Sequence, residues 1–174
     1  MKKYIVFFVF LFFCSFSFGQ NRIDKKASPE NSLTKIILLR HAEKVLDGSK
    51  DPNLTEAGEQ RAEKLRLMFS DINIDRVFST PYNRTQKTVA PLANEKGLNI
   101  EIYDPKDLNF TDFLFQKVKG TTSLIVGHSN SIPKLVNKLI GSEKYQELSE
   151  DEYGKIWILT YSNDALIDCS LYNF

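Results

Sequence analysis

The sequence predicts a three-layer α/β/α domain with a mainly parallel central sheet, and three observations support that fold class. Short apolar runs of strand length alternate with longer segments whose apolar residues recur at helical spacing. The run Thr122–Val126 has the continuous apolar character expected of a parallel strand covered on both faces. The chain of 174 residues shows no internal repeat, so we expect one domain.

The elements are expected in the following order. They are a strand at 36–39, a helix at 54–69, a strand at 76–79, a helix that starts around 80–81, a strand at 100–103, a short helix stopped at 120, a strand at 122–126, a helix at 132–140, and a hairpin of strands at 156–161 and 165–171. Residues 20–34 are polar and aperiodic, which predicts a flexible lead-in before a domain at 35–174.

The helices carry recognisable start and stop signals. Thr55, Thr80 and Thr111 are expected to cap the first three helices, because a hydroxyl can accept a hydrogen bond from a free backbone amide. Pro91 should kink or end the second helix, since proline has no amide hydrogen to donate. Gly141 follows the helical spacing of the fourth helix and predicts its end.

The first nineteen residues form a segment that we exclude from the fold. A short basic start precedes an apolar run from Tyr4 to Phe13, and small residues follow up to Gly19. This pattern is typical of a signal peptide cleaved near Gly19, and it predicts a periplasmic or secreted protein. An uncleaved membrane anchor is the alternative, although the run is shorter than the ~20 residues that span a bilayer. A lipid anchor on Cys14 is disfavoured because bulky Phe13 precedes it.

The charge of the chain excludes some partners. The full chain has 23 basic and 22 acidic residues, and loss of Lys2 and Lys3 with the signal peptide changes its formal net charge from +1 to −1. Such a chain lacks the basic excess that nucleic acids or anionic membranes attract. We therefore expect no nucleic-acid partner and no stable membrane association after cleavage. The sequence predicts nothing about the oligomeric state.

Both histidines of the chain stand where an apolar strand ends. His41 follows the first apolar run and His128 follows the fourth. Ligands of open α/β sheets bind at the carboxyl ends of the strands, so we expect the two histidines in one site. Arg40 directly precedes His41, and Arg84 comes a few residues after the second strand. Planar guanidinium groups at such a site predict an anion, with phosphate as the first candidate.

Four blocks of sequence around these residues carry a resemblance to a known family. They are residues 39–43 (LRHAE), 54–62 (LTEAGEQRA), 79–88 (STPYNRTQKT) and 127–130 (GHSN). In this order they resemble the histidine phosphatase superfamily, also called phosphoglycerate mutase-like, with Ala42 in place of the glycine of its Arg-His-Gly signature. The blocks span the domain from Lys35 to about Ile140, and the chain looks like a small bacterial phosphatase-type member.

The resemblance implies a function and a role for each residue. His41 would be the nucleophile that takes up the phosphoryl group of a small phosphorylated substrate, a phosphomonoester or related compound. Arg40 and Arg84 would grip the phosphoryl oxygens, and His128 would face His41 as a cation or proton donor. Such a set needs no cofactor and no metal, because the positive groups themselves stabilise the charge on the transferred phosphoryl group. Hydrolysis then proceeds in two easier steps through phosphohistidine.

The chemistry adds one expectation about His41. Its attacking nitrogen must be neutral, and a hydrogen bond from the other ring nitrogen to a backbone carbonyl would secure that state.

The general acid that protonates the leaving oxygen is left open. Larger members of the family supply a carboxylate after the strand expected here at 100–103, which makes Asp104 and Asp107 candidates. Glu43, two residues from the nucleophile, is a third candidate. Each of the three can also be an ordinary loop charge. Without an acid the enzyme should favour good leaving groups, such as acyl phosphates, phosphohistidine or aryl phosphates, since protonation contributes ~10² to 10⁴ in rate.

Three other functions are weighed against hydrolysis. A non-catalytic phosphate-binding or interaction protein would keep the arginines, but such proteins often lose a pocket histidine and this chain has both. A mutase-type phosphotransferase is disfavoured because the short loops predict an open pocket. A metal-dependent hydrolase would need carboxylates beside His41 and His128, and the charge of Arg40 would repel the cation.

Overall fold

The computed structural model describes residues 33–107 and 109–174 as alternating strands and helices. The elements are β1 (Leu33–Arg40), α1 (Glu56–Met68), β2 (Arg76–Ser79), α2 (Asn83–Lys96), β3 (Ile100–Ile102), α3 (Phe110–Val118), β4 (Thr122–Gly127), α4 (Ser131–Ile140), β5 (Lys155–Ser162) and β6 (Ala165–Asn173). The expected signal peptide at 1–19 and most of the expected lead-in lie outside the described residues. Within the described ranges, no helix has both the length and the apolar character to cross a membrane.

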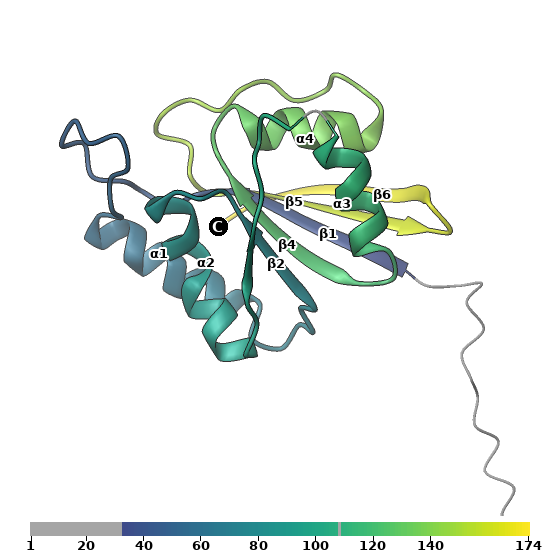
Figure 1. Cartoon of the computed structure of the whole chain (residues 1–174), viewed down its shortest axis with the longest axis horizontal. Coiled ribbons are helices and arrows are strands. Elements are labelled where there is room, and N and C mark those ends of the chain that lie inside the picture. Colours follow the sequence, from purple (N-terminus) through teal and green to yellow (C-terminus); the bar gives the residue numbers. More distant parts are fainter. Residues whose placement is uncertain (1–32, 108) are drawn as a thin grey trace, which may run out of the picture.

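The six strands form one sheet in the order β3-β2-β4-β1-β5-β6 (Figure 1). The pairs β3·β2, β2·β4 and β4·β1 are parallel, whereas β5 pairs antiparallel with both β1 and β6. The sheet is therefore mixed, with a parallel part that carries the helices and a hairpin at one edge. Arg40 at the end of β1 pairs with Gly127 at the end of β4. Hence the residues that follow these two, His41 and His128, leave the sheet next to each other.

Helices cover both faces of the sheet, which confirms the three-layer α/β/α architecture (Figure 1). Alternate residues of β1 point to opposite faces, as the pleat of a strand requires. Ile37 and Leu39 pack in the cluster that contains α1 and α2, and Ile36 and Leu38 pack in the cluster that contains α3 and α4. Both faces of β1 are thus buried, and its end is held rigidly at the site.

The start of the domain differs from the expected boundary between residues 34 and 35. Leu33 and Thr34 belong to β1, where they pair with Ser162 and Tyr161 of β5, and Thr34 is buried. The expected lead-in is therefore too long by two residues. The antiparallel partner strand extends β1 beyond its apolar run, because backbone pairing does not depend on apolar side chains.

The first helix begins as its sequence predicts. The amide of Gly58 donates to the Thr55 hydroxyl at 3.1 Å, which confirms the cap. A β-carbon on Gly58 would lie 2.2 Å from the carbonyl oxygen of Glu43, so this helix position requires glycine. The close contact holds α1 against the loop that follows His41.

The starts of α2 and α3 differ from the prediction. Helix α2 begins at Asn83 with no side-chain cap, since the Thr80 hydroxyl lies against Thr85 and His128 instead. Helix α3 begins at Phe110 after Asn109, so Thr111 lies within the helix.

Pro91 was predicted to kink or end the second helix, and it does not end α2. The helix continues through Pro91 to Lys96 and stops at Gly97 in a left-handed conformation. Pro91 lines a surface cleft with Lys87, whose carbonyl is the one that a proline at this position leaves without its helical partner. Helix α4 ends at Gly141, as the sequence predicts.

Candidate active site

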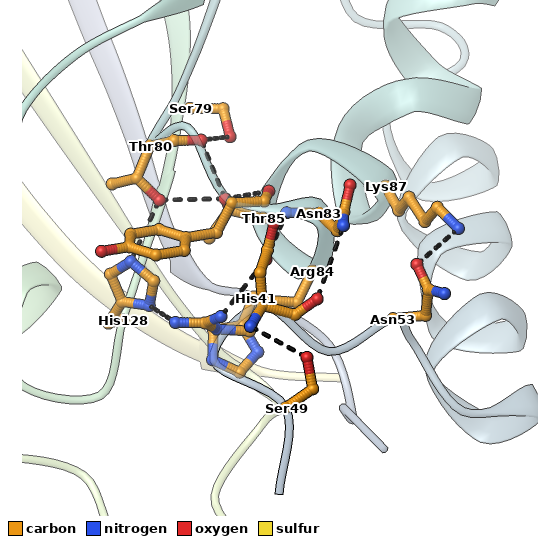
Figure 2. A network of polar contacts seen from close by, with 12 residues as sticks. His41, Ser49, Asn53, Ser79, Thr80, Asn83, Arg84, Thr85, Lys87 and His128 are labelled. Carbon is orange, nitrogen blue, oxygen red and sulfur yellow. Dashed lines mark hydrogen bonds and ion pairs between the residues drawn. The ribbon is translucent and has the colours of Figure 1, made fainter. Parts of the chain in front are cut away.

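His41, Arg84 and His128 meet at the carboxyl ends of β1, β2 and β4, and Arg40 joins them from the last position of β1. The ring centroids of the two histidines are 5.5 Å apart, at an interplanar angle of 69°. Figure 2 shows Arg84 beside both rings. The structure thus brings together the four residues that the sequence assigns to the phosphoryl site.

His41 is neutral and held in one orientation. Its ring is 3% exposed, and its Nδ1 donates a hydrogen bond to the Ala42 carbonyl oxygen at 2.7 Å. This confirms the expected backbone partner. Burial, together with the nearby charges of Arg40, His128 and Arg84, lowers the pKa of His41 to about 3, against the opposing effect of the Ala42 carbonyl. With Nδ1 protonated, Nε2 carries the lone pair, which is the state required of a nucleophile.

Thr88 ties the His41 loop to helix α2. The amide of Ala42 donates to the Thr88 hydroxyl at 2.9 Å, and that hydroxyl donates to the Arg84 carbonyl oxygen at 2.7 Å. The carbonyl that orients His41 and the backbone of Arg84 are therefore fixed relative to each other. Thr88 lies in a sequence block of the resemblance, yet sequence reasoning assigned it no role.

His128 is also neutral in the protein without an anion. Its Nε2 lies 3.0 Å from the Thr80 hydroxyl, and its Nδ1 lies 3.5 Å from Nη2 of Arg84. Burial lowers the pKa of His128 to about 4, helped by the charges of Arg84, Lys44 and Arg40. His128 is therefore uncharged in this state, and its expected role as a cation or proton donor facing a bound phosphoryl group stays a prediction. The same arginines that attract an anion keep the imidazole from taking up a proton.

The Arg40 side chain is clamped by the loop that precedes β5. It is 1% exposed, and its Nη1 donates to the carbonyl oxygens of Ser149 at 2.6 Å and Glu152 at 3.1 Å. The ring of Tyr153 lies under the guanidinium, 4.2 Å from Cζ to the ring centroid. Nη2 lies 3.5 Å from the carboxylate of Glu150, a side chain that is 76% exposed. One arginine thus links the first strand to a loop more than a hundred residues later.

The Arg84 side chain is held by other side chains. Its Cζ lies 4.5 Å from the ring centroid of Tyr82, whose ring also meets His128 edge-on at 5.2 Å. Its Nη1 lies 3.6 Å from Oδ1 of Asp51, and that oxygen accepts a hydrogen bond from the amide of Asn83 at 2.8 Å. Asp51 therefore orients the guanidinium from the solvent side.

Three guanidinium nitrogens at the site are buried without a hydrogen-bond partner among the described residues. They are Nε of Arg40 and both Nε and Nη1 of Arg84. An unpaired buried donor is costly, more so when it belongs to a charged group. A tetrahedral anion supplies several acceptor oxygens at once and would satisfy such donors. The site therefore has the polarity and the vacant donors of an anion pocket next to the free nitrogen of His41.

Comparison with known proteins finds similarity to one family over part of the chain. The family model described as histidine phosphatase superfamily (branch 1) matches residues 36–109, which include His41, Arg40 and Arg84. Over these residues the chain is similar to the histidine phosphatase superfamily. Among curated relatives, phosphoserine phosphatase 1 of Hydrogenobacter thermophilus is 34% identical over 74 residues, which cover 39% of this chain and 35% of that protein. A relative from Schizosaccharomyces pombe is 28% identical over 92 residues, 49% of this chain and 41% of that protein. The matched part thus spans well under half the length of these relatives.

Solved structures share the fold of this chain. The protein histidine phosphatase SixA complexed with tungstate has a TM-score of 0.61 at 17% identity, covering 80% of this chain and 96% of that one. Phosphoserine phosphatase of Entamoeba histolytica in complex with 3-phosphoglyceric acid has a TM-score of 0.60 at 17% identity, covering 79% and 96%. At these identities the likeness shows the common fold alone.

Glu43 is unsuited to the general-acid role that the sequence left open for it. Both of its carboxylate oxygens accept hydrogen bonds from Arg61, at 2.7 to 3.0 Å. This pairing with Arg61 lowers the pKa of Glu43 below its ordinary value, against the effect of burial. A carboxylate bound on both oxygens by one guanidinium has no proton to donate at neutral pH. Glu43 instead joins the His41 loop to α1.

The other two candidates lie after β3, at the far edge of the parallel part of the sheet. Asp104 and Asp107 are exposed, and each accepts a hydrogen bond at 2.9 Å from the amide two residues later, of Lys106 and Asn109. These are local turn contacts. Asp104 also lines a cleft of about 340 Å³ together with Tyr82, the residue whose ring lies against His128. Asp104 therefore borders the approach to the site, and its role as an acid stays a prediction.

Other residues of this site lie in parts of the sequence that have no pattern indicating a function. Asp51, Glu150 and Tyr153 lie in loops that have no apolar periodicity, and nothing in their spacing indicates a site. Tyr82 stands inside a block of the resemblance but was not singled out. Among the residues that the structure describes, no group of three His, Cys, Asp or Glu side chains is placed to hold a metal ion.

Proposed function

We propose that this chain is a phosphatase that hydrolyses a phosphomonoester or related phosphoryl compound through a phosphohistidine on His41. One observation carries the proposal: the unprotonated Nε2 of His41 lies in a site with three buried guanidinium nitrogens that have no hydrogen-bond partner among the described residues. A neutral nucleophile beside vacant, fixed positive donors is the arrangement that phosphoryl transfer requires. The names of the curated relatives support the same activity.

In the first step the substrate phosphoryl group occupies the anion pocket, where Arg40 and Arg84 donate to its oxygens. Nε2 of His41 attacks phosphorus, a P–N bond forms, and the P–O bond to the leaving group breaks with its electron pair on that oxygen. The positive charge that develops on the imidazole is supported by the hydrogen bond from Nδ1 to the Ala42 carbonyl. The guanidinium donors hold the equatorial oxygens throughout the transfer.

In the second step water attacks the phosphorus of phosphohistidine. The P–N bond breaks, its electron pair returns to Nε2, and inorganic phosphate leaves with the oxygen of that water. One proton of the water stays on the phosphate oxygen that it supplies, and the other is released to solvent. His41 is then neutral again and ready for the next substrate.

The proposal extends to the choice of substrate. Glu43 is tied to Arg61, and the hydrogen bonds of Asp104 and Asp107 are local turn contacts. We therefore propose small phosphorylated substrates with good leaving groups, such as aryl phosphates, acyl phosphates or phosphohistidine, which depend least on an acid. We also propose that turnover needs no metal, since guanidinium groups supply the positive charge.

The test is an assay of the chain without residues 1–19 against p-nitrophenyl phosphate, acetyl phosphate, phosphohistidine and an alkyl phosphate, each with and without chelator. The expected result is phosphate release that chelator does not reduce, with a much lower rate on the alkyl phosphate. The His41→Ala variant should release none above background. Full activity in that variant, or activity abolished by chelator and restored by zinc, contradicts the proposal.

We also propose that residues 1–19 are an export signal, so that the enzyme acts in the periplasm or outside the cell. The short basic start, the apolar run and the small residues before Gln20 support this. Expression of the full chain in a bacterial host, followed by fractionation and N-terminal sequencing, tests it. A mature N-terminus near Gln20 in the periplasm or medium is expected, and an intact chain that stays in the cytoplasm contradicts it.

A further inference from the structure

Beside the anion pocket, a chain of three side chains runs from His128 into the protein interior. Nε2 of His128 lies 3.0 Å from the Thr80 hydroxyl oxygen, which lies 2.9 Å from the Thr85 hydroxyl oxygen (Figure 2). Both threonines are fully buried. A buried polar chain of this kind needs every proton assigned to a partner, because an unmatched donor or acceptor there is costly. The direction of these hydrogen bonds is therefore a physical constraint on His128.

The inner end of the chain orients the hydrogens. The Thr85 hydroxyl has one hydrogen, and two backbone carbonyl oxygens accept from it, those of Tyr82 at 2.8 Å and Thr80 at 3.0 Å. With its hydrogen directed at a carbonyl, Thr85 can only accept from Thr80. The single hydrogen of Thr80 then points to Thr85, so Thr80 presents a lone pair to His128. Nε2 of His128 must in turn be the donor.

The outer end leads independently to the same assignment. Nδ1 of His128 faces Nη2 of Arg84 at 3.5 Å. A guanidinium has donors and no acceptor, so the nitrogen opposite it must carry a lone pair. In neutral imidazole one nitrogen carries the proton and the other does not. Both ends therefore put the proton of His128 on Nε2, whereas the contact with Ala42 puts the proton of His41 on Nδ1.

We propose that Thr80 and Thr85 are positioning residues that hold His128 in the Nε2-protonated form. The unprotonated Nδ1 of His128 then faces the anion site and is the nitrogen of this ring that can accept a proton. This rests on the proposed function for what His128 does there. A phosphoryl group that binds as a monoanion transfers its proton to Nδ1, and a dianion draws that proton from solvent. In both cases the resulting imidazolium donates Nδ1–H to a phosphoryl oxygen, while Nε2–H stays on Thr80.

The two neutral histidines of the domain should therefore have opposite tautomers. Nitrogen-15 NMR distinguishes them without substrate, since the two-bond proton–nitrogen couplings differ for the two ring nitrogens. The mature chain contains only His41 and His128, and the His41→Gln variant assigns the two signal sets. At pH 7 the expected spectrum has His41 protonated at Nδ1 and His128 protonated at Nε2. A His128 protonated at Nδ1 in the unsubstituted protein overturns the proposal outright.

Substitution of Thr80 tests the cause of the lock. Thr80→Val removes the hydroxyl at nearly constant volume, and Thr80→Ser restores it. In Thr80→Val we expect a mixture of His128 tautomers and a kcat reduced roughly tenfold to a hundredfold, the range usual for residues that orient a functional histidine, with KM little changed. Thr80→Ser should restore both readouts. An unchanged His128 tautomer in Thr80→Val contradicts the inference.

Ser79→Ala is the matched control. It removes a neighbouring buried hydroxyl, which donates to the Thr80 carbonyl at 2.9 Å, whereas the hydrogen bond with the imidazole is made by Thr80. The tautomer and kcat should both stay as in the unsubstituted protein, and a loss equal to that of Thr80→Val would show a general packing effect and overturn the proposal. The two claims can fail separately. If the tautomers are as expected but no substrate is turned over, the proposed function fails and the lock stands.

Discussion

His41 and His128 face each other across one site, yet different parts of the chain hold them. The His41 half depends on backbone: a carbonyl orients the ring, and two more carbonyls clamp Arg40. The His128 half depends on side chains: Thr80 contacts the ring, and Asp51 and Tyr82 hold Arg84. Each arginine lies over a tyrosine, so the halves are alike in composition and differ in support.

The difference matches the two tasks. A nucleophile must present one nitrogen at a fixed angle, and a backbone carbonyl, which cannot rotate away, secures that geometry. The facing histidine must change its protonation state when an anion arrives, and a chain of hydroxyls can remain bonded while the ring gains a proton. Under the proposed function, the site would therefore combine a rigid half that forms the covalent bond with a half whose charge adapts to the ligand.

The largest expected effect separates the two histidines. His41→Ala should reduce kcat for p-nitrophenyl phosphate by roughly 10⁴ or more, the scale of losing a covalent nucleophile. His128→Gln should reduce it by about 10² to 10³, within the range of a general acid or base. Steady-state kinetics with circular dichroism as a folding control measure both. Equal losses in the two variants would remove the distinction between the halves.

The next largest effects are expected for substitutions of the two arginines, and these variants should differ from each other more in stability than in activity. Arg40→Lys and Arg84→Lys should each lower kcat/KM by about 10², because an ammonium cannot hold two oxygens in one plane. Arg40→Lys should also lower the free energy of unfolding by about 1 to 3 kcal/mol, since the carbonyls of Ser149 and Glu152 lose a buried donor. Thermal melts compare the two variants. A greater loss of stability in Arg84→Lys would contradict the backbone clamp.

The pH dependence of the free energy of unfolding should reflect the protonation of both histidines. Folding lowers the pKa of His41 from 6.5 to about 3 and that of His128 to about 4. Below pH 6.5 the unfolded chain takes up protons that the folded chain does not, which lowers the free energy of unfolding. The contribution of the two histidines to stability is therefore complete above pH 6.5 and is lost as the pH falls toward 4. The slope should be about 1.4 kcal/mol per pH unit for each histidine.

Urea unfolding between pH 7 and pH 5 measures that slope. His128→Gln removes one of the two titrating groups and should roughly halve it. In the unsubstituted protein, saturating phosphate should also flatten the slope, because an anion bound at the site favours a protonated His128. The same slope in the variant and the unsubstituted protein would mean that His128 is not kept neutral by the fold.

The smallest expected effect concerns Glu43. Glu43→Gln should lower stability by about 1 kcal/mol through loss of the Arg61 pair, and should leave kcat on an alkyl phosphate within a few-fold of its original value. Loss of a general acid would instead cost ~10² to 10⁴ on such a poor leaving group. A drop of that size in Glu43→Gln, with aryl phosphate turnover kept, would restore Glu43 as the acid.

The sequence predicted the parts of the site that follow strands and missed the parts that come from loops. Each of the first four expected strands, and the hairpin, occupies nearly its predicted residues, and the buried strands β1, β2 and β4 are read most directly because they are largely apolar runs. His41 and His128 were therefore placed correctly by the strands before them. Tyr153 and Asp51 lie in loops, where position depends on the rest of the fold and leaves no periodic trace.

Helix starts were predicted less well, for a related reason. A threonine before a helical segment can cap it, as Thr55 does, or can be engaged elsewhere, as Thr80 is by Thr85 and His128. Local sequence does not distinguish the two, because the competing partner comes from another strand. The neutral state of His128 was missed in the same way, since it depends on burial and on how close Arg84 lies.

The central claim is that His41 becomes covalently phosphorylated at Nε2. A direct test mixes the mature chain with a labelled aryl phosphate and quenches within milliseconds in denaturing alkali, where a phosphorus–nitrogen bond survives. Peptide mass spectrometry then locates the phosphoryl group. The account predicts one phosphoryl group per chain, on His41, lost on brief acid treatment and absent in His41→Ala. Turnover with no label on His41, or a label on His128 instead, would contradict it.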